Sequence, residues 1–339
     1  MRRSTIIFRL LSALAAVGLG AGCICLWLLL RPITLHGDGF VYVARSSSVA
    51  SALDTVARHV TLPTPRFTSF AAKMAARLTS KRIQAGWYQF RDGDTQWDVL
   101  KALFSAHRRP TVRVTIPEGL TFVEIASILR RVARVDSAAF HQWCERDSIC
   151  QRYGVPAGSM EGYLKPDTYE FFMREDAASV GTRMATAFAA MWEREAEGLL
   201  AATGRTKHDL LTLASIVQTE AAQVDEMPRI AGVYSNRLDR GMKLEADPTV
   251  QYALGAKRRL RYRDLDVSSA YNTYAHAGLP PGPIANVGLD AIKASLEPER
   301  HNFMFFVADG TGRHRFATTG AQHLRNVALY RAERRRQSR

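Results

Sequence analysis

The chain has 339 residues, 47% of them hydrophobic and 23% charged, with a formal net charge of +14 at pH 7. This is an ordinary globular composition, and it supplies enough apolar side chain for one large domain or two modest ones. Part of the positive charge lies in the tail "RAERRRQSR", but no recognised nucleic-acid motif accompanies it, so we exclude nucleic acid as a partner. Attraction to anionic lipid head groups or cell-wall carboxylates is one interpretation of the tail, and a frayed, solvated end is the other.

The N-terminal region contains an uncharged stretch from Leu10 to Leu30 that is long enough to cross a bilayer as a helix. It runs directly into Arg31, whereas a cleaved signal peptide would end in a small-x-small site, so we expect a retained anchor. Three arginines precede the stretch, and the positive-inside rule places them in the cytoplasm. We therefore predict a cytoplasmic tail at 1–5, a transmembrane anchor at 6–31, and a remainder outside the cytoplasmic membrane.

The four cysteines do not indicate a metal site. Cys23 and Cys25 lie in the predicted span, and Cys144 and Cys150 would face an oxidising space, where a disulfide is one of two open outcomes. Their spacing lacks the paired Cys and His ligands of a zinc site. We expect neither a metal nor a cofactor.

Three segments after the anchor share a pattern of alternating strand, turn and short amphipathic helix: "GFVYVARSSSVASALDTVARHV", "AGWYQFRDGDTQWDVLKALF" and "VRVTIPEGLTFVEIASILRRV". In the last two, a glycine suits the turn (Gly93, Gly119), and a threonine two residues later suits the helix N-cap (Thr95, Thr121). The middle unit resembles a LysM-type module, a fold associated with binding glycans that contain N-acetylglucosamine. We assign 36–110 to a LysM-like βα subdomain, with a purely structural spacer as the alternative, and 111–175 to a second βα unit and a junction.

The remaining region, 176–339, mixes helices and strands. A helical pattern covers 176–223, a second helix should run through "MPRIAGVYSNRLDRGM" and stop at Gly241, and "HNFMFFVADGTGRHRFATT" reads as a β-hairpin with an Asp-Gly turn. The sequence therefore predicts an α+β catalytic domain here.

Glu220 is the first candidate for chemistry. At about 100° per residue, it extends the apolar stripe of Leu210, Leu213 and Val217, whereas Gln218 lies about 160° away on another flank. A carboxylate on an apolar stripe should have a raised pKa, which suits a proton donor near neutral pH. The structural alternative is a glutamate that caps backbone or pairs with Arg237.

A second carboxylate is less obvious. Asp247, in "LEADPTVQYALG", precedes Pro248 and so also fits a helix N-cap, a purely structural role. Further on, "AYNTYAHAGLPPGPIANVG" is a stiff loop rich in proline and glycine that begins with amide, hydroxyl and ring side chains suited to sugars. An ordinary connecting loop is the alternative.

The ordered set "EGYLKPDTYEF", "SIVQTEA", "NRLDRGMKLEADPTVQYALG", "AYNTYAHAGLPPGPIAN" and "FMFFVADGTGRHRF" resembles the YceG-like (MltG-type) endolytic murein transglycosylase family. The resemblance implies cleavage of the β-1,4 bond between N-acetylmuramic acid and N-acetylglucosamine, with a 1,6-anhydro-muramyl end. The family's helix usually reads Glu-x-Glu and its catalytic residue is the second glutamate, which corresponds to Glu220. The chain departs at the first position, Gln218.

The same resemblance carries further residues to the cleft as substrate-positioning groups: Asp247, Thr249, Tyr271, Asn272 and Thr273, with Asn236 and Arg237 as supports. Tyr163 and Asp167 belong either to the cleft wall or to the domain junction. The resemblance implies peptidoglycan glycan strands as substrate, cell-wall synthases as partners, and an inner-membrane enzyme that faces the periplasm. Two alternatives stay open, a hydrolytic muramidase with Asp247 as second carboxylate and a non-catalytic peptidoglycan-binding scaffold.

Overall fold

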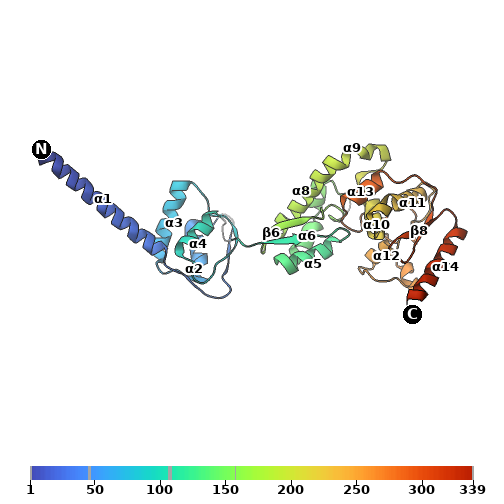
Figure 1. Cartoon of the computed structure of the whole chain (residues 1–339), viewed down its shortest axis with the longest axis horizontal. Coiled ribbons are helices and arrows are strands. Elements are labelled where there is room, and N and C mark those ends of the chain that lie inside the picture. Colours follow the sequence, from blue (N-terminus) through green and yellow to red (C-terminus); the bar gives the residue numbers. More distant parts are fainter. Residues whose placement is uncertain (1, 45–46, 106–108, 157, 338–339) are drawn as a thin grey trace. The chain divides into compact units, whose positions relative to one another are not determined.

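The computed structural model describes residues 2–44, 47–105, 109–156 and 158–337, and within these ranges the side chains from residue 13 to residue 336. The chain divides into two compact units (Figure 1). Unit 1 comprises residues 1–112 and 172–175, and unit 2 comprises residues 113–171 and 176–339. Each unit is described by itself below.

Unit 1 alternates short strands with helices, as the sequence predicts for its βα segments. Two antiparallel pairs, β1 with β3 and β2 with β4, provide its strands, and in the second pair Val41 lies opposite Tyr88. The elements are α1 (Arg2–Leu29), β1 (Thr34–Leu35), β2 (Phe40–Val43), α2 (Val49–Ala57), β3 (Val60–Thr61), α3 (Pro65–Thr79), β4 (Gly86–Gln89) and α4 (Gln96–Ser105).

Gln96, at the start of α4, is a fully buried polar side chain in the core of unit 1. Its amide oxygen accepts hydrogen bonds from the Thr64 and Thr68 hydroxyls, and its amide nitrogen donates to the Leu28 carbonyl at 2.7 Å. A buried amide is stable only when such partners satisfy it. These bonds join α3 and α4 to the last turn of α1.

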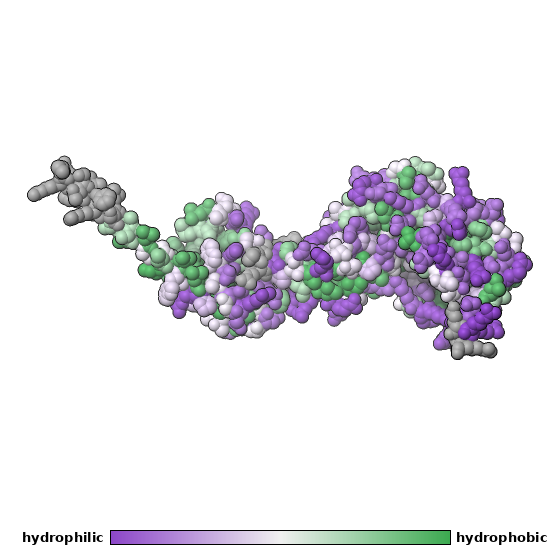
Figure 2. Space-filling view, in the orientation of Figure 1, coloured by the Kyte–Doolittle hydropathy of each residue, from purple (hydrophilic) through white to green (hydrophobic). Residues whose placement is uncertain are grey.

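Helix α1 carries exposed apolar side chains along its described length. Six of them are 56–72% exposed: Leu14, Val17, Leu19, Ile24, Leu26 and Trp27. The described part of α1, next to the grey end, is largely green in Figure 2. Among the residues with described side chains, no helix is long and apolar enough to cross a membrane. The anchor at 6–31 therefore stays a prediction.

Unit 2 has a mixed α+β architecture, which confirms the predicted fold class. Strand β5 (Thr111–Thr115), which begins at the unit boundary, pairs with β6 (Thr168–Phe172), and β7 (Phe305–Ala308) pairs with β8 (His314–Ala317). The helices are α5 (Phe122–Ala133), α6 (Ser137–Cys144), α7 (Asp147–Arg152), α8 (Ala177–Glu195), α9 (Glu197–Leu200), α10 (Lys207–Glu220), α11 (Met227–Asp239), α12 (Asp247–Ala253), α13 (Leu289–Leu296) and α14 (Gly320–Gln337), with short 3-10 turns at Ala201–Thr203, Val224–Glu226 and Tyr262–Asp266.

The predicted turn and cap before α5 are confirmed. Gly119 adopts a φ of +75°, a left-handed conformation that costs glycine little. Thr121 caps the helix in a reciprocal pair with Glu124, in which each side chain accepts from the other residue's backbone N–H. Thr95 and Asp98 make the equivalent bonds at α4, so the two βα units end their turns in the same way.

Helix α10 lies at the centre of unit 2, packed against α11, α12 and α13 (Figure 1). It is buried on every side from Leu210 to Val217, not only along the apolar stripe. Ser215, on the opposite side, is fully buried, donates to the Thr212 carbonyl and accepts from the Ile284 N–H at 3.0 Å. The proline-rich segment therefore covers the polar side of α10.

Two further predicted elements are confirmed, and one open question receives an answer. Helix α11 ends before Gly241, which has a φ of +65°, and the β7–β8 hairpin turns at Asp309, whose carboxylate accepts from the Thr311 and Arg313 N–H groups. Cys144 and Cys150 are buried free thiols.

Packing between α6 and α8 depends on the small size of Gly181. A Cβ at this position would lie 2.4 Å from the Trp143 ring, which is buried and has no room to move away, whereas a Cβ at Gly198 would meet nothing within 4 Å. We expect Gly181→Ala to lower the free energy of unfolding by about 1–3 kcal/mol despite the better helix propensity of alanine. Gly198→Ala, the matched control, should leave it unchanged or raise it by up to about 1 kcal/mol. Thermal denaturation of both variants checks this, and equal stability of the two would contradict the packing argument.

Candidate active site

Glu220 is the last residue of α10. The helix begins at a capping box between Thr206 and Asp209, and its buried length carries the chain to Glu220, after which Ala221 turns to an extended conformation. The Glu220 side chain is half-buried, and its Oε1 accepts a hydrogen bond from the Tyr234 hydroxyl at 3.1 Å. The alternative pairing of Glu220 with Arg237 is wrong, because Arg237 donates elsewhere.

The Glu220 carboxyl has the electrostatic properties of a proton donor. Loss of hydration raises its pKa to about 7, the Tyr234 hydrogen bond opposes that rise, and the negative charge of Asp247 adds to it. At neutral pH the group is therefore divided between its acid and carboxylate forms, which allows it to give and to take a proton.

Asp247 lies close enough to influence Glu220, but it is not the predicted N-cap. Helix α12 begins at Asp247 itself, with Ala246 in the cap position, so the capping interpretation is wrong. The Asp247 carboxylate instead accepts from the Tyr274 hydroxyl at 2.7 Å. Burial raises the pKa of Tyr274 above its ordinary value, so this hydroxyl keeps its proton and donates.

Arg237 and Asn236 hold the surrounding backbone. Arg237 is buried and donates to the carbonyls of Met304 and Leu244 at 2.7 and 2.9 Å and to the Glu245 carboxylate. The Asn236 amide donates to the carbonyls of His301 and Phe303. Both side chains join α11 to neighbouring segments, and the Arg237 bonds reach the segment that leads into Asp247.

Thr249, Asn272 and Thr273 are buried within the protein. The Thr249 and Thr273 hydroxyls lie 2.9 Å apart, and Thr273 also accepts from the Ala246 N–H. The Asn272 amide donates to two backbone carbonyls and accepts from the Tyr274 N–H. These three side chains thus fix the backbone on which Asp247 and Tyr274 are mounted.

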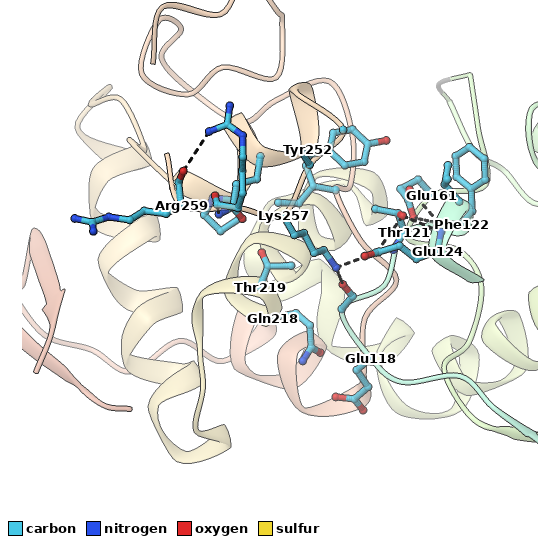
Figure 3. Close-up of a pocket in the computed structure, with 18 residues that line it drawn as sticks. Glu118, Thr121, Phe122, Glu124, Glu161, Gln218, Thr219, Tyr252, Lys257 and Arg259 are labelled. Carbon is cyan, nitrogen blue, oxygen red and sulfur yellow. Dashed lines mark hydrogen bonds and ion pairs between the residues drawn. The ribbon is translucent and has the colours of Figure 1, made fainter. Parts of the chain in front are cut away.

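Beside Glu220 and Asp247 lies a cavity of about 810 Å³ (Figure 3). Their chain neighbours Thr219 and Pro248 line it, although Glu220 and Asp247 do not. The other lining residues are Glu118, Gly119, Thr121, Phe122, Val123, Glu124, Glu161, Gln218, Gln251, Tyr252, Gly255, Ala256, Lys257, Arg258, Arg259 and Ile284. The volume falls within the range of about 300–1,000 Å³ that is usual for ligand pockets.

One wall of the cavity depends on a buried carboxyl, Glu161. Its Oε1 accepts from the Phe122 N–H at 3.1 Å and from the Asn286 amide at 2.8 Å. Burial raises the pKa of Glu161 to about 8, while the Phe122 bond opposes the rise. Asn286 also accepts from the Leu164 N–H, so the two side chains join three distant segments.

Gln218, where the resemblance leads us to expect a glutamate, has its own partners away from Glu220. Its amide oxygen accepts from the Gly288 N–H at 3.0 Å, and its side chain makes a hydrogen bond with Glu118, which lies beside it in Figure 3. A glutamate here would place a second carboxylate against Glu118, which like-charge repulsion disfavours. An amide both donates and accepts, so it suits this chain's surroundings.

Tyr271 contacts the ring of a residue that lines the cavity. It is half-buried, and its ring centroid is 4.8 Å from that of Tyr252, which lines the cavity. Tyr163 is buried, with its hydroxyl 2.9 Å from His208 Nδ1, and Asp167 is exposed and paired with Lys165. The structure thus brings Glu220 and Asp247 together and places Tyr271 against Tyr252, one of the residues that line the cavity.

Sequence reasoning missed Tyr234, Tyr274 and Glu161 as candidate site residues. Tyr234 lies in α11, fourteen positions from Glu220, and only the packing of α10 on α11 brings them together. Tyr274 belongs to the same ring- and hydroxyl-bearing start of the loop as Tyr271–Thr273, but the resemblance carried only those three residues to the cleft. Among the described residues, no group of three or more His, Cys, Asp or Glu side chains is placed to hold a metal ion.

A mixed α+β fold in which burial raises the pKa of a half-buried carboxyl to about 7, beside a cavity of ligand size, is an arrangement typical of enzymes. The YceG-like family matches residues 41–329, and the chain belongs to that family. It is 30% identical over 263 residues to the endolytic murein transglycosylase of Bacillus subtilis strain 168, with 71% of each chain covered. The protein of that name from Streptococcus pneumoniae strain D39 is 29% identical over 280 residues, which cover 73% of this chain and 50% of the relative.

Solved structures support the same relationship. The crystal structure of a YceG-like protein from Listeria monocytogenes superimposes with a TM-score of 0.60 at 28% identity, covering 84% of this chain and 98% of that one. The similarity therefore extends over nearly the whole length of the solved chain.

The two neighbours of the Glu220 carboxyl should shift its pKa in opposite directions. Tyr234→Phe removes a hydrogen bond that favours the carboxylate, so the pKa should rise, and Asp247→Asn removes a like charge, so it should fall. NMR titration of the Glu220 carboxyl in the parent and both variants measures the shifts. A shift of the same sign in both variants would contradict this account of the site.

Proposed function

We propose that this chain is an endolytic murein transglycosylase that cleaves the bond between N-acetylmuramic acid and N-acetylglucosamine within glycan strands. The family match over residues 41–329 and the names of two relatives at 29–30% identity support the activity. The observation that carries the chemistry is Glu220, whose pKa of about 7 lies near the optimum for a group that acts first as acid and then as base.

In the proposed reaction, protonated Glu220 gives its proton to the oxygen that links C1 of muramic acid to the next sugar. The C1–O bond breaks, and the C6 hydroxyl of the same muramic acid attacks C1. Glu220, now a carboxylate, takes the C6 hydroxyl proton and returns to its acid form. The products are a strand with a 1,6-anhydro-muramyl end and a strand with a free C4 hydroxyl, and no water is consumed.

An internal nucleophile explains how a single carboxyl suffices. Most glycoside hydrolases need two carboxylates, one of which activates water or attacks the sugar directly. A hydroxyl held next to the reacting carbon has an effective molarity on the order of 10⁵ M or more, which offsets the missing second group. In this reaction Asp247, which accepts a hydrogen bond from Tyr274, raises the pKa of Glu220 and contacts the substrate.

The remaining predicted residues divide between direct and indirect roles in this proposal. Tyr271, which is half-buried against the cavity residue Tyr252, contacts the sugar, whereas Thr249, Asn272 and Thr273 position the sugar through the backbone that they hold. Asn236 and Arg237 act in the same indirect way, because their donors are bonded to backbone carbonyls.

Cleavage should depend on the Glu220 carboxyl. We expect Glu220→Gln to lower turnover of uncrosslinked peptidoglycan strands by at least about 10²-fold, the usual contribution of a general acid or base. Glu193→Gln, at an exposed position of α8, is the matched control and should retain full activity. Mass spectrometry identifies the released ends.

The nature of those ends distinguishes the alternatives. Anhydro-muramyl ends from the parent protein that disappear in the Glu220 variant are the expected result. Reducing muramic ends would contradict the transglycosylase activity and would support a muramidase that uses Asp247 as its second carboxylate. If the parent protein binds the strands but does not cut them, the result would support a non-catalytic peptidoglycan-binding scaffold.

We further propose that 6–31 anchors the chain in the inner membrane, with 1–5 in the cytoplasm and the site in the periplasm. The uncharged stretch and the exposed apolar side chains of α1 support this. The LysM-like subdomain and the synthase partners stay predictions of the resemblance.

The anchor is tested by fractionation of a Gram-negative host that expresses the chain. The full chain should stay with the membranes after alkaline carbonate and high salt, and a chain without residues 1–30 should be released. Protease added to spheroplasts should reach residues after 31. A full chain that carbonate extracts would disprove the anchor.

A further inference from the structure

The cavity beside Glu220 is richer in charge than the cleavage of a neutral sugar strand requires. Its lining includes three basic residues in sequence, Lys257, Arg258 and Arg259, and three glutamates, Glu118, Glu124 and Glu161. Most of these charges already have partners within the protein. The few that do not are therefore the informative ones.

Two of the basic side chains are engaged in the framework of the cavity. Lys257 Nζ lies 2.9 Å from both the Glu124 carboxylate and the Gly119 carbonyl. Arg258 makes two hydrogen bonds to the Asp264 carboxylate, at 2.7 and 2.9 Å. These pairs fix the walls and leave little net charge for a ligand.

Arg259 is different. Its side chain is exposed, and among the described residues its guanidinium has no hydrogen-bond or ion-pair partner. In Figure 3 its side chain extends outward from the cavity lining, away from the other labelled residues. An arginine presents a rigid fork of N–H donors that matches a carboxylate, and here that fork is held available at the rim.

Glu118 lies at another part of the rim, well apart from Arg259 in Figure 3. Its side chain is exposed and makes a hydrogen bond with the neutral Gln218 side chain, and the charge that acts on it, Asp290, is also negative. The carboxyl is held in place over Gly288, where a Cβ would come within 1.9 Å of it. The rim thus offers one cationic and one anionic group, and the apolar side chains that line the cavity include Phe122, Tyr252 and Ile284.

The sugars of a murein strand do not complement such a rim. N-acetylglucosamine is neutral, and the lactyl carboxyl of muramic acid is consumed in the amide bond to its peptide. The formal charges of the strand lie on that peptide, as carboxylates and as the amino group of its diamino acid. A sugar bound at Glu220 would carry its peptide into reach of the cavity, because the cavity begins at the next residue, Thr219.

We propose that the cavity lined by Glu118, Tyr252 and Arg259 binds the peptide attached to muramic acid, with a peptide carboxylate at Arg259 and the diamino-acid ammonium at Glu118. This subsite rests on the proposed function, since it assigns to the same enzyme a second part of the same substrate. It makes the enzyme selective for strands whose muramic acid still carries a peptide.

The first test compares two substrates with the full-length chain in detergent. One is uncrosslinked strands with their peptides, and the other is the same strands after an amidase has removed them. We expect kcat/KM to be about tenfold higher for the peptide-bearing strands, the factor that one charge-assisted contact at an open site provides. Arg259→Ala and Glu118→Gln should each reduce that ratio severalfold, Arg259→Lys should restore part of it, and Arg240→Ala, an exposed arginine at the end of α11, should keep it.

The second measurement is independent of turnover. Calorimetric binding of a muramyl tetrapeptide, with a diamino acid at its third position, should be about tenfold weaker for Arg259→Ala than for the parent, and unchanged for Arg240→Ala. Equal melting temperatures confirm that the variants are folded.

The outcomes separate the two proposals. If the parent cuts both substrates equally and Arg259→Ala binds the muramyl peptide as the parent does, the peptide subsite is overturned and the transglycosylase stands. If neither substrate is cut but the parent binds the muramyl peptide through Arg259, the activity fails and the peptide site stands.

Discussion

Asn286 joins three stretches of unit 2 that lie far apart in the sequence. Its side chain bonds to the Leu164 N–H, the Leu120 carbonyl and the Glu161 carboxyl, and its backbone pairs with that of Leu120 in an isolated bridge. The segment around Asn286 has no helix or strand of its own, so buried backbone groups need such partners. Ser215 and Gln218 of α10 satisfy two more of them, at Ile284 and Gly288.

This constraint determines where Glu220 lies. Because the irregular segment covers the polar side of α10, the helix is enclosed from Leu210 to Val217 and becomes accessible again at its last turn. The carboxyl at that turn is shielded enough to lose hydration and open enough to meet a ligand. The same polar contacts that satisfy the segment also place Gln218 and Glu161 in the cavity wall, so the acid and the cavity depend on one framework.

The environment of Glu220 also clarifies the meaning of the departure at position 218. The amide is bonded to Gly288 and Glu118, on a different flank of α10 from the acid, and neither bond involves Glu220. The pKa of the acid is raised by burial and adjusted by Tyr234 and Asp247 instead. The residue that differs from the family pattern therefore supports the cavity wall, while the acid keeps its own partners.

Local sequence patterns predict much of this organisation. Turn glycines, capping threonines and hydrophobic periodicity were enough to predict the βα units, α11 and the β7–β8 hairpin, because these signals act between residues close in the chain. The position of Glu220 on a buried helix and its raised pKa follow from the same periodicity.

Only the tertiary structure decided the rest. The contact of Tyr234 with Glu220, the bond of Tyr274 to Asp247 and the burial of Thr249, Asn272 and Thr273 join residues brought together by helix packing, which local pattern does not encode. The buried role of Glu161 has the same origin, since a carboxyl shows no sequence signal for the distant amide that satisfies it.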